Sequence, residues 1–227
     1  MTQFIYLKQG QKLPFFFKPH KEDVFITGKK GEGKTSRIKM ILDLIQDRPY
    51  WIWCPERPEE KFGNYAHVVR RIEDLKYGQY VYAGPDLSMK NFRKFCQKVL
   101  TMTNMVVVWD DIHKYVKKQW CPDELKEIIL SKRNEGISSI YATTTAKSIP
   151  NEILGNSTHA FAYRFQLQSD AEWLAMNYFG VEAWLLIQKD RRKKGCFDFA
   201  DDIDILPEYS FIYRRDDELE TKVVINA

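Results

Sequence analysis

Residues 23–35 of this chain read DVFITGKKGEGKT, and this stretch decides the fold. Its first five residues form a short, mostly apolar and β-rich run that ends in a cluster of glycines, as expected for a strand that enters a tight loop. From Thr35 onward, apolar residues recur at helical spacing until Arg48 and Pro49 end the pattern. The stretch therefore predicts a strand, a glycine-rich loop and a helix in direct succession.

The loop matches the pattern G-x-x-x-x-G-K-[ST], which binds nucleotide phosphates when it joins a strand to a helix. Its glycines let backbone N–H groups surround the β-phosphate, and the helix N-terminus adds its positive dipole end. Lys34 would reach the β- and γ-phosphates, and the Thr35 hydroxyl would ligate Mg²⁺. We expect ATP and Mg²⁺ as cofactors, bound by Gly28, Lys29, Lys30, Gly31, Glu32, Gly33, Lys34, Thr35 and Ser36. The alternative is a chance glycine-rich turn, which the strand and helix around it disfavour.

A second motif follows about 75 residues later, where the apolar run MVVVW at residues 105–109 leads into Asp110 and Asp111. Ligands of open α/β sheets gather at the carboxyl ends of strands. Asp110 would hold Mg²⁺ through water, and Asp111 stands where many ATPases place a glutamate that polarises the attacking water. Aspartate is one methylene shorter, so it must sit closer or act through a second water. The alternative is that the pair only ends a strand in solvent.

The rest of the chain alternates strand and helix patterns. Strands are expected at residues 50–54, 79–83, 105–109, 137–142 and 159–163, and helices at 88–100, 122–132 and 169–179. This alternation predicts an α/β fold with a mostly parallel sheet covered on both faces. Residues 196–200, 209–215 and 221–225 are predicted as short strands, with a C-terminal β-hairpin at about 209–225. We expect an N-terminal arm at residues 1–22 and a single domain at 23–227.

These motifs resemble those of the FtsK-HerA family of DNA-pumping ATPases, above all the genome-packaging ATPases of tailless icosahedral viruses with double jelly-roll capsids. The resemblance extends from about Asp23 to Arg192. Residues 109–115, WDDIHKY, are similar to the family's D-E-A-H-like segment. Residues 130–144, LSKRNEGISSIYATT, are similar to its pattern of an arginine, a glycine, an apolar strand and T-Q, with Thr144 in the place of the glutamine. Residues 159–165, HAFAYRF, look like its strand ending in F-R.

The resemblance implies a RecA-like P-loop NTPase fold of the ASCE class that assembles into a pentameric or hexameric ring. In such rings ATP lies at a subunit junction, and an arginine from the neighbouring subunit stabilises the charge of the transition state. Arg133 and Arg164 are the candidates, and Thr144 would sense the γ-phosphate through a hydroxyl that reaches less far than a glutamine. The planar, permanently charged guanidinium suits this task because it can bond two phosphate oxygens.

The implied activity is ATP hydrolysis that drives double-stranded viral DNA into a preformed capsid. Further implied partners are capsid, vertex or membrane proteins, and the expected location is the host cytoplasm, at assembling virions. Lys114, Lys117 and Lys118, and the basic run at residues 189–194, are candidate DNA phosphate contacts, although such runs are more often solvated surface. Two other interpretations are a nucleotide-gated assembly ATPase that does not pump DNA and a small-molecule kinase.

Composition restricts these interpretations only weakly. The 35 basic and 31 acidic residues give a net charge of +4, which permits a polyanionic partner without indicating one. The four cysteines lack the spacing of a zinc site or a disulfide framework. We find no run of about 18 uncharged apolar residues and no signal-peptide pattern, so we expect a chain that does not cross a membrane.

Overall fold

A computed structural model describes residues 2–7, 15–163, 165, 168–179, 211–216 and 221–226. The strands are β1 (Thr2–Leu7), β2 (Val24–Thr27), β3 (Tyr50–Trp53), β4 (His67–Val69), β5 (Gln79–Tyr82), β6 (Met105–Trp109), β7 (Ile137–Thr143), β8 (His159–Ala162), β9 (Phe211–Arg215) and β10 (Thr221–Asn226). The α-helices are α1 (Lys34–Asp43), α2 (Pro58–Phe62), α3 (Met89–Leu100), α4 (Asp123–Ser131), α5 (Asn151–Asn156) and α6 (Gln168–Leu174). Short helical turns are η1 (Ile72–Asp74), η2 (Ile112–Lys114), η3 (Lys132–Glu135), η4 (Ala146–Ser148) and η5 (Ala175–Phe179).

All described strands belong to one sheet, in the order β1-β10-β9-β8-β2-β7-β6-β3-β5-β4. β9 runs antiparallel to its neighbours β8 and β10, and the other pairs are parallel. The predicted α/β class, the mostly parallel sheet and the C-terminal hairpin are thus confirmed. The strand expected at residues 196–200 lies outside the described residues.

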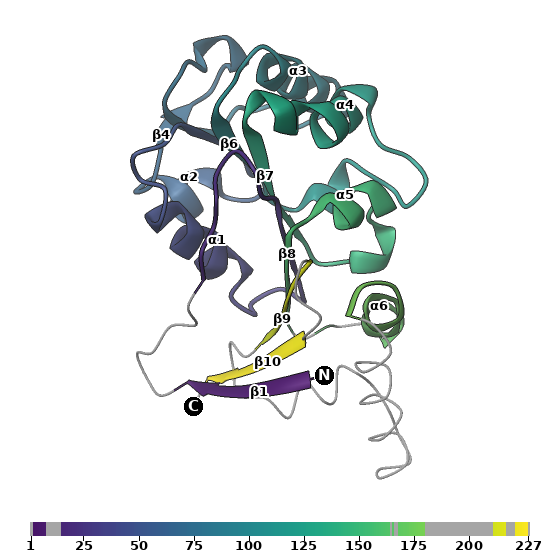
Figure 1. Cartoon of the computed structure of the whole chain (residues 1–227). Helices are drawn as coiled ribbons and strands as arrows, with labels where there is room; N and C mark the ends of the chain where they lie inside the picture. Colours follow the sequence, from purple (N-terminus) through teal and green to yellow (C-terminus); the bar gives the residue numbers. More distant parts are fainter. Residues whose placement is uncertain are drawn as a thin grey trace.

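Helices cover both faces of the central sheet because successive side chains of a strand point to opposite sides (Figure 1). Val24 and Ile26 of β2 pack on one face with apolar residues of α1 and α2. Phe25, between them, packs on the other face with residues of α3, α4, α5 and α6. Such strands are buried on both sides, which explains why their sequences are almost continuously apolar.

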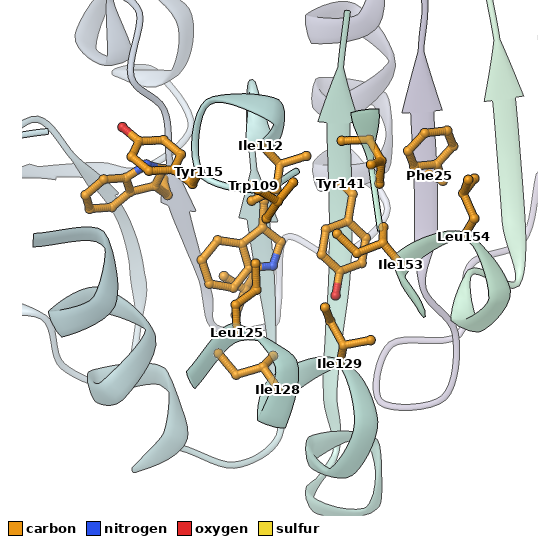
Figure 2. Packing of buried hydrophobic residues seen from close by; sticks show 14 of the residues in the cluster. Phe25, Trp109, Ile112, Tyr115, Leu125, Ile128, Ile129, Tyr141, Ile153 and Leu154 are labelled. Carbon is orange, nitrogen blue, oxygen red and sulfur yellow. The ribbon is translucent and has the colours of Figure 1, made fainter. Parts of the chain in front are cut away.

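Aromatic side chains fill much of the second face. Trp53 stacks on Tyr82 with ring centroids 5.0 Å apart, and Phe92 of α3 stacks on Tyr115 at 4.2 Å. Figure 2 shows Trp109 next to Leu125 of α4, and Tyr115 belongs to the same cluster. Full burial of one such side chain contributes roughly 1.5–3 kcal/mol. The cluster fixes both ends of the segment that carries Asp110 and Asp111.

The segment before β2 is joined to the sheet. β1 lies beside β10, so residues of the expected arm form an edge of the sheet (Figure 1). Further along, the carboxylate of Glu22 lies 3.0 Å from Nε2 of His159 and 3.1 Å from Nη2 of Arg215. These contacts connect the segment to β8 and β9. No helix in the described part of the chain is long and apolar enough to span a bilayer.

Candidate nucleotide-binding site

The glycine-rich loop connects β2 directly to α1, as predicted. Gly31 and Gly33 adopt φ angles of 91° and 94°, in the left-handed region that side chains other than glycine rarely occupy. Gly33 is the N-terminal cap of α1, so the free N–H groups of the first helical turn lie beside the loop. A loop of this shape followed by a helix N-terminus binds anions.

Lys34 is the first residue of α1, and its side chain is folded back over the loop. Its ammonium group donates to the carbonyl oxygens of Gly28 at 2.6 Å and Lys29 at 2.8 Å. Burial lowers the pKa of Lys34, and the nearby carboxylates of Asp111 and Asp110 oppose that change. The ammonium group is therefore held at the loop before any phosphate is bound.

The sheet order explains how distant motifs meet. β7 lies between β2 and β6, and β3 lies on the far side of β6. The loop after β2, Thr144 after β7 and Asp110 after β6 therefore share the carboxyl edge of the sheet. They surround a pocket of about 540 Å³, lined by Lys30, Gly31, Gly33, Lys34, Thr35, Ser36, Glu56, Lys61, Asp110, Asp111, His113, Lys114 and Thr144.

Asp110 is buried at the end of β6, and two neighbouring groups donate to its Oδ2 atom. Nζ of Lys61 lies 2.8 Å away, and Sγ of Cys54 lies 3.2 Å away. Burial raises the pKa of the Cys54 thiol, so this sulfur keeps its proton. The metal ligand expected from the sequence is thus a buried carboxylate that faces the pocket and pairs with a lysine.

Asp111 also lines the pocket, and its backbone is left-handed, with φ 52° and ψ 41°. Burial and the adjacent charge of Asp110 raise the pKa of its carboxyl group. Nζ of Lys114 lies 3.8 Å from Oδ2. A carboxylate with a raised pKa is a better proton acceptor than an ordinary aspartate, as a general base requires.

Thr144 lines the pocket beside His113. The Thr144 hydroxyl is 3.4 Å from Nε2 of His113, which η2 positions. Burial lowers the pKa of His113, so the ring is neutral at pH 7. A neutral imidazole and a hydroxyl can exchange donor and acceptor roles when a nearby charge changes.

Glu56 and two lysines form the outer rim of the pocket. Both lysines donate to the carboxylate of Glu56, Lys114 at 2.7 Å and Lys30 at 3.4 Å. The hydrogen bond from Lys114 lowers the pKa of Glu56 to about 2. Lys114, expected from the sequence to contact DNA, therefore lines the nucleotide pocket.

The residues present fit Mg²⁺. Thr35 and Asp110 both line the pocket, and Mg²⁺ is commonly bound by one or two protein oxygens, water and substrate phosphates. Among the described residues there is no group of three or more histidine, cysteine or acidic side chains that could hold a metal ion. An ion at this site would therefore depend on the bound phosphates for further ligands.

Of the two candidate arginines, the structure describes only the backbone of Arg133. Arg133 belongs to η3, which precedes β7 and so lies at the amino edge of the sheet, opposite the pocket of the same subunit. Its side chain and the whole of Arg164 lie outside the described residues.

Solved structures resemble this chain closely in fold. The genome packaging NTPase B204 from Sulfolobus turreted icosahedral virus 2, in complex with ATP-gammaS, matches with a TM-score of 0.70 and 17% identity over 91% of this chain and 98% of that one. This chain has the RecA-like P-loop fold of B204. The DNA-packaging ATPase B204 from Sulfolobus Turreted Icosahedral Virus matches with a TM-score of 0.69, at 17% identity over 91% and 98% of the two chains.

The B204 fold also occurs in a longer protein. The pCW3 conjugation coupling protein TcpA, with ATPgS, matches with a TM-score of 0.55 and 13% identity over 89% of this chain and 60% of that one. No protein-family model matches the sequence, and no curated protein matches it.

Sequence reasoning missed Lys61 and Glu56 as pocket residues. Both follow β3, whose parallel neighbour β6 delivers Asp110. A usable signal was present, because polar residues just after any central parallel strand lie at the edge where ligands bind.

Proposed function

We propose that this chain is an ATPase that drives double-stranded DNA into a preformed viral capsid. The observation that carries the proposal is one pocket that is lined both by Lys34 and Thr35, at the start of α1, and by Asp110 and Asp111. The fold that this chain shares with B204, a genome packaging NTPase, supports genome packaging over other activities of ATPases. The protein would work in the host cytoplasm at assembling virions, with capsid, vertex or membrane proteins as partners.

In the proposed reaction, the loop N–H groups and the start of α1 hold the phosphates, and Lys34 exchanges its two carbonyl partners for phosphate oxygens. Thr35 and Asp110 would hold Mg²⁺, which neutralises phosphate charge when bound. Asp111 orients the attacking water and accepts its proton as the new P–O bond forms and the bond to ADP breaks. Thr144 contacts the γ-phosphate. When the γ-phosphate leaves, the Thr144 hydroxyl changes its hydrogen bond with His113.

The proposed assembly is a pentameric or hexameric ring, in which Arg133 acts on the ATP of a neighbouring subunit. Its backbone is separated from the pocket of its own subunit by the length of β7, whose seven residues span about 20 Å. This placement favours action in trans over action in cis. Arg164 is the second candidate.

A turn after the acidic pair supports a role in DNA contact. Lys117 and Trp120 exchange backbone hydrogen bonds of 2.8 and 2.9 Å, and all four residues of the turn are exposed. Its two lysines, Lys117 and Lys118, offer phosphate contacts that do not depend on base sequence. Tyr115 and Val116, buried between the turn and the pocket residue Lys114, anchor the start of the turn in the core. The basic run at residues 189–194 lies outside the described residues.

The experiment that tests the proposal is ATP turnover by the purified protein with and without double-stranded DNA. A DNA translocase should turn over faster with DNA, and equally well with unrelated sequences. A nucleotide-gated assembly ATPase, the alternative, should hydrolyse ATP at a rate that DNA does not change. That result, under conditions where DNA binds, would refute DNA pumping.

A further inference from the structure

Lys61 reaches into the nucleotide pocket from an element that the sequence motifs do not include. It belongs to α2, a helix of five residues that follows β3. Its ammonium group lies 2.8 Å from Oδ2 of Asp110, whose side chain is 3% exposed, whereas that of Lys61 is 25% exposed. Phe62, the next residue, is fully buried and anchors the end of the helix. The contact is therefore a partly buried ion pair on a fixed support.

The other lysines of the pocket have different hydrogen-bond partners. Lys34 donates to backbone carbonyls, and Lys30 and Lys114 donate to Glu56. Within the described part of the chain, Lys61 is thus the lysine that hydrogen-bonds to Asp110. Its position is specific and does not follow from a general excess of positive charge.

A carboxylate as buried as Asp110 is unstable without a compensating cation. In the proposed function, Asp110 would hold the metal ion, directly or through water, by its negative charge. The ammonium group is compact and strongly charged, so it can neutralise that carboxylate. Lys61 and the metal ion therefore compete for the same carboxylate.

We propose that Lys61 is a resident cation that neutralises Asp110 while the metal site is empty and withdraws from Asp110 when nucleotide binds with its metal ion. This inference rests on the proposed function of the pocket. It has two consequences. First, Lys61 strengthens the binding of nucleotide without metal, because it shields the phosphates from the charge of Asp110. Second, it reduces the affinity that the metal ion adds, because the ion pair with Asp110 must first break. Both consequences lower the preference of the site for metal-bound nucleotide.

The test uses the non-hydrolysable analogue AMPPCP, whose dissociation constant is measured by calorimetry in EDTA and again in excess Mg²⁺. The readout is the dissociation constant in EDTA divided by that in Mg²⁺, which measures the preference for metal-bound nucleotide. For Lys61→Met we expect this ratio to rise about tenfold above the wild-type ratio. This change is larger than the effect of losing an exposed ion pair and smaller than that of losing a fully buried one. Lys30→Met is the matched control, since it removes one positive charge from the same pocket at a lysine paired with Glu56. It should change both constants alike. Lys61→Arg, which keeps the cation, should leave the ratio close to that of the wild type.

Each variant is its own reference in this ratio, so a modest loss of stability does not imitate the effect. A ratio for Lys61→Met that equals those of the wild type and Lys30→Met would overturn the inference and leave the ion pair as a structural contact. If the wild-type protein bound AMPPCP in neither buffer, the proposed function itself would fail, and the inference with it.

Discussion

Replacing Asp111 by asparagine should make the protein more stable while it removes hydrolysis. The ionised carboxylate is disfavoured at this position, because burial and the adjacent Asp110 raise its pKa. Asparagine has nearly the same shape without the charge. It also tolerates the left-handed backbone at φ 52°, which alanine would strain. Asparagine therefore isolates the effect of the charge.

The two expected effects have different sizes. Removing a disfavoured charge should raise the free energy of unfolding by about 1 kcal/mol, or Tm by roughly 2–4 °C for a chain of this length. Removing a positioned base should reduce kcat by about 10²–10⁴-fold, while nucleotide still binds. Activity and stability should thus move in opposite directions.

The pH dependence of the stability gain provides a further check. Because the pKa of Asp111 in the folded state lies above its ordinary value of 3.8, the wild-type protein is destabilised by the ionised group at pH 7. The difference from the variant should shrink as pH falls through that raised pKa, and it should vanish below 3.8, where Asp111 is protonated in both the folded and unfolded states.

Asp110→Asn is the matched control, because it changes the neighbouring residue in the same way. Here the ion pair with Lys61 is lost, so this variant should be destabilised by about 1–3 kcal/mol. Thermal melts at pH 7 and single-turnover hydrolysis measure both effects. A lower Tm for Asp111→Asn, or unchanged hydrolysis in both variants, would refute the assigned roles of the acidic pair.

Three other outcomes are expected. Lys34→Ala should lose nucleotide binding by calorimetry but keep a wild-type circular dichroism spectrum, because the ammonium group bonds to loop carbonyls and takes no part in the apolar core; binding at the wild-type level would remove the basis of the site. Arg133→Ala and Lys34→Ala chains, each inactive alone, should regain partial ATPase activity when mixed, increasingly with protein concentration. No recovery in rings that demonstrably form would shift the role to Arg164. Lys117→Ala with Lys118→Ala should weaken DNA binding alike for all sequences and reduce the salt slope by about 2; an unchanged slope would exclude the turn as a phosphate contact.

The central sheet could be predicted from the sequence because its signals are local. Each of the strands β2, β3, β6 and β8 is a short apolar run, and the glycine loop fixes which strand precedes a helix. The elements that escaped prediction are brief or depend on distant partners. β4 has three residues and α2 has five, too few for a hydrophobic period to appear. β1 is specified by its pairing with β10.

The candidate site was predictable where a motif fixes both residue type and position, as for Lys34, Thr35 and the acidic pair. The position of Lys61 depends on β3 lying beside β6, and the sheet order is not written in any single segment. Lys114 illustrates the opposite difficulty. Its charge indicated a basic surface, but the η2 turn directs it to Glu56 in the pocket.

The pairing of β1 with β10 has a consequence for how the chain folds. Thr2 lies opposite Thr221, so this contact joins two segments that are far apart in the sequence and closes a long loop. On the ribosome, β1 emerges long before β10, the strand with which it pairs in the described part of the sheet. The edge of the sheet should therefore assemble last, as a slow step set by contact order. Until then β1 is a free strand that another newly made chain could capture, and rapid synthesis at high local concentration would favour that misassembly.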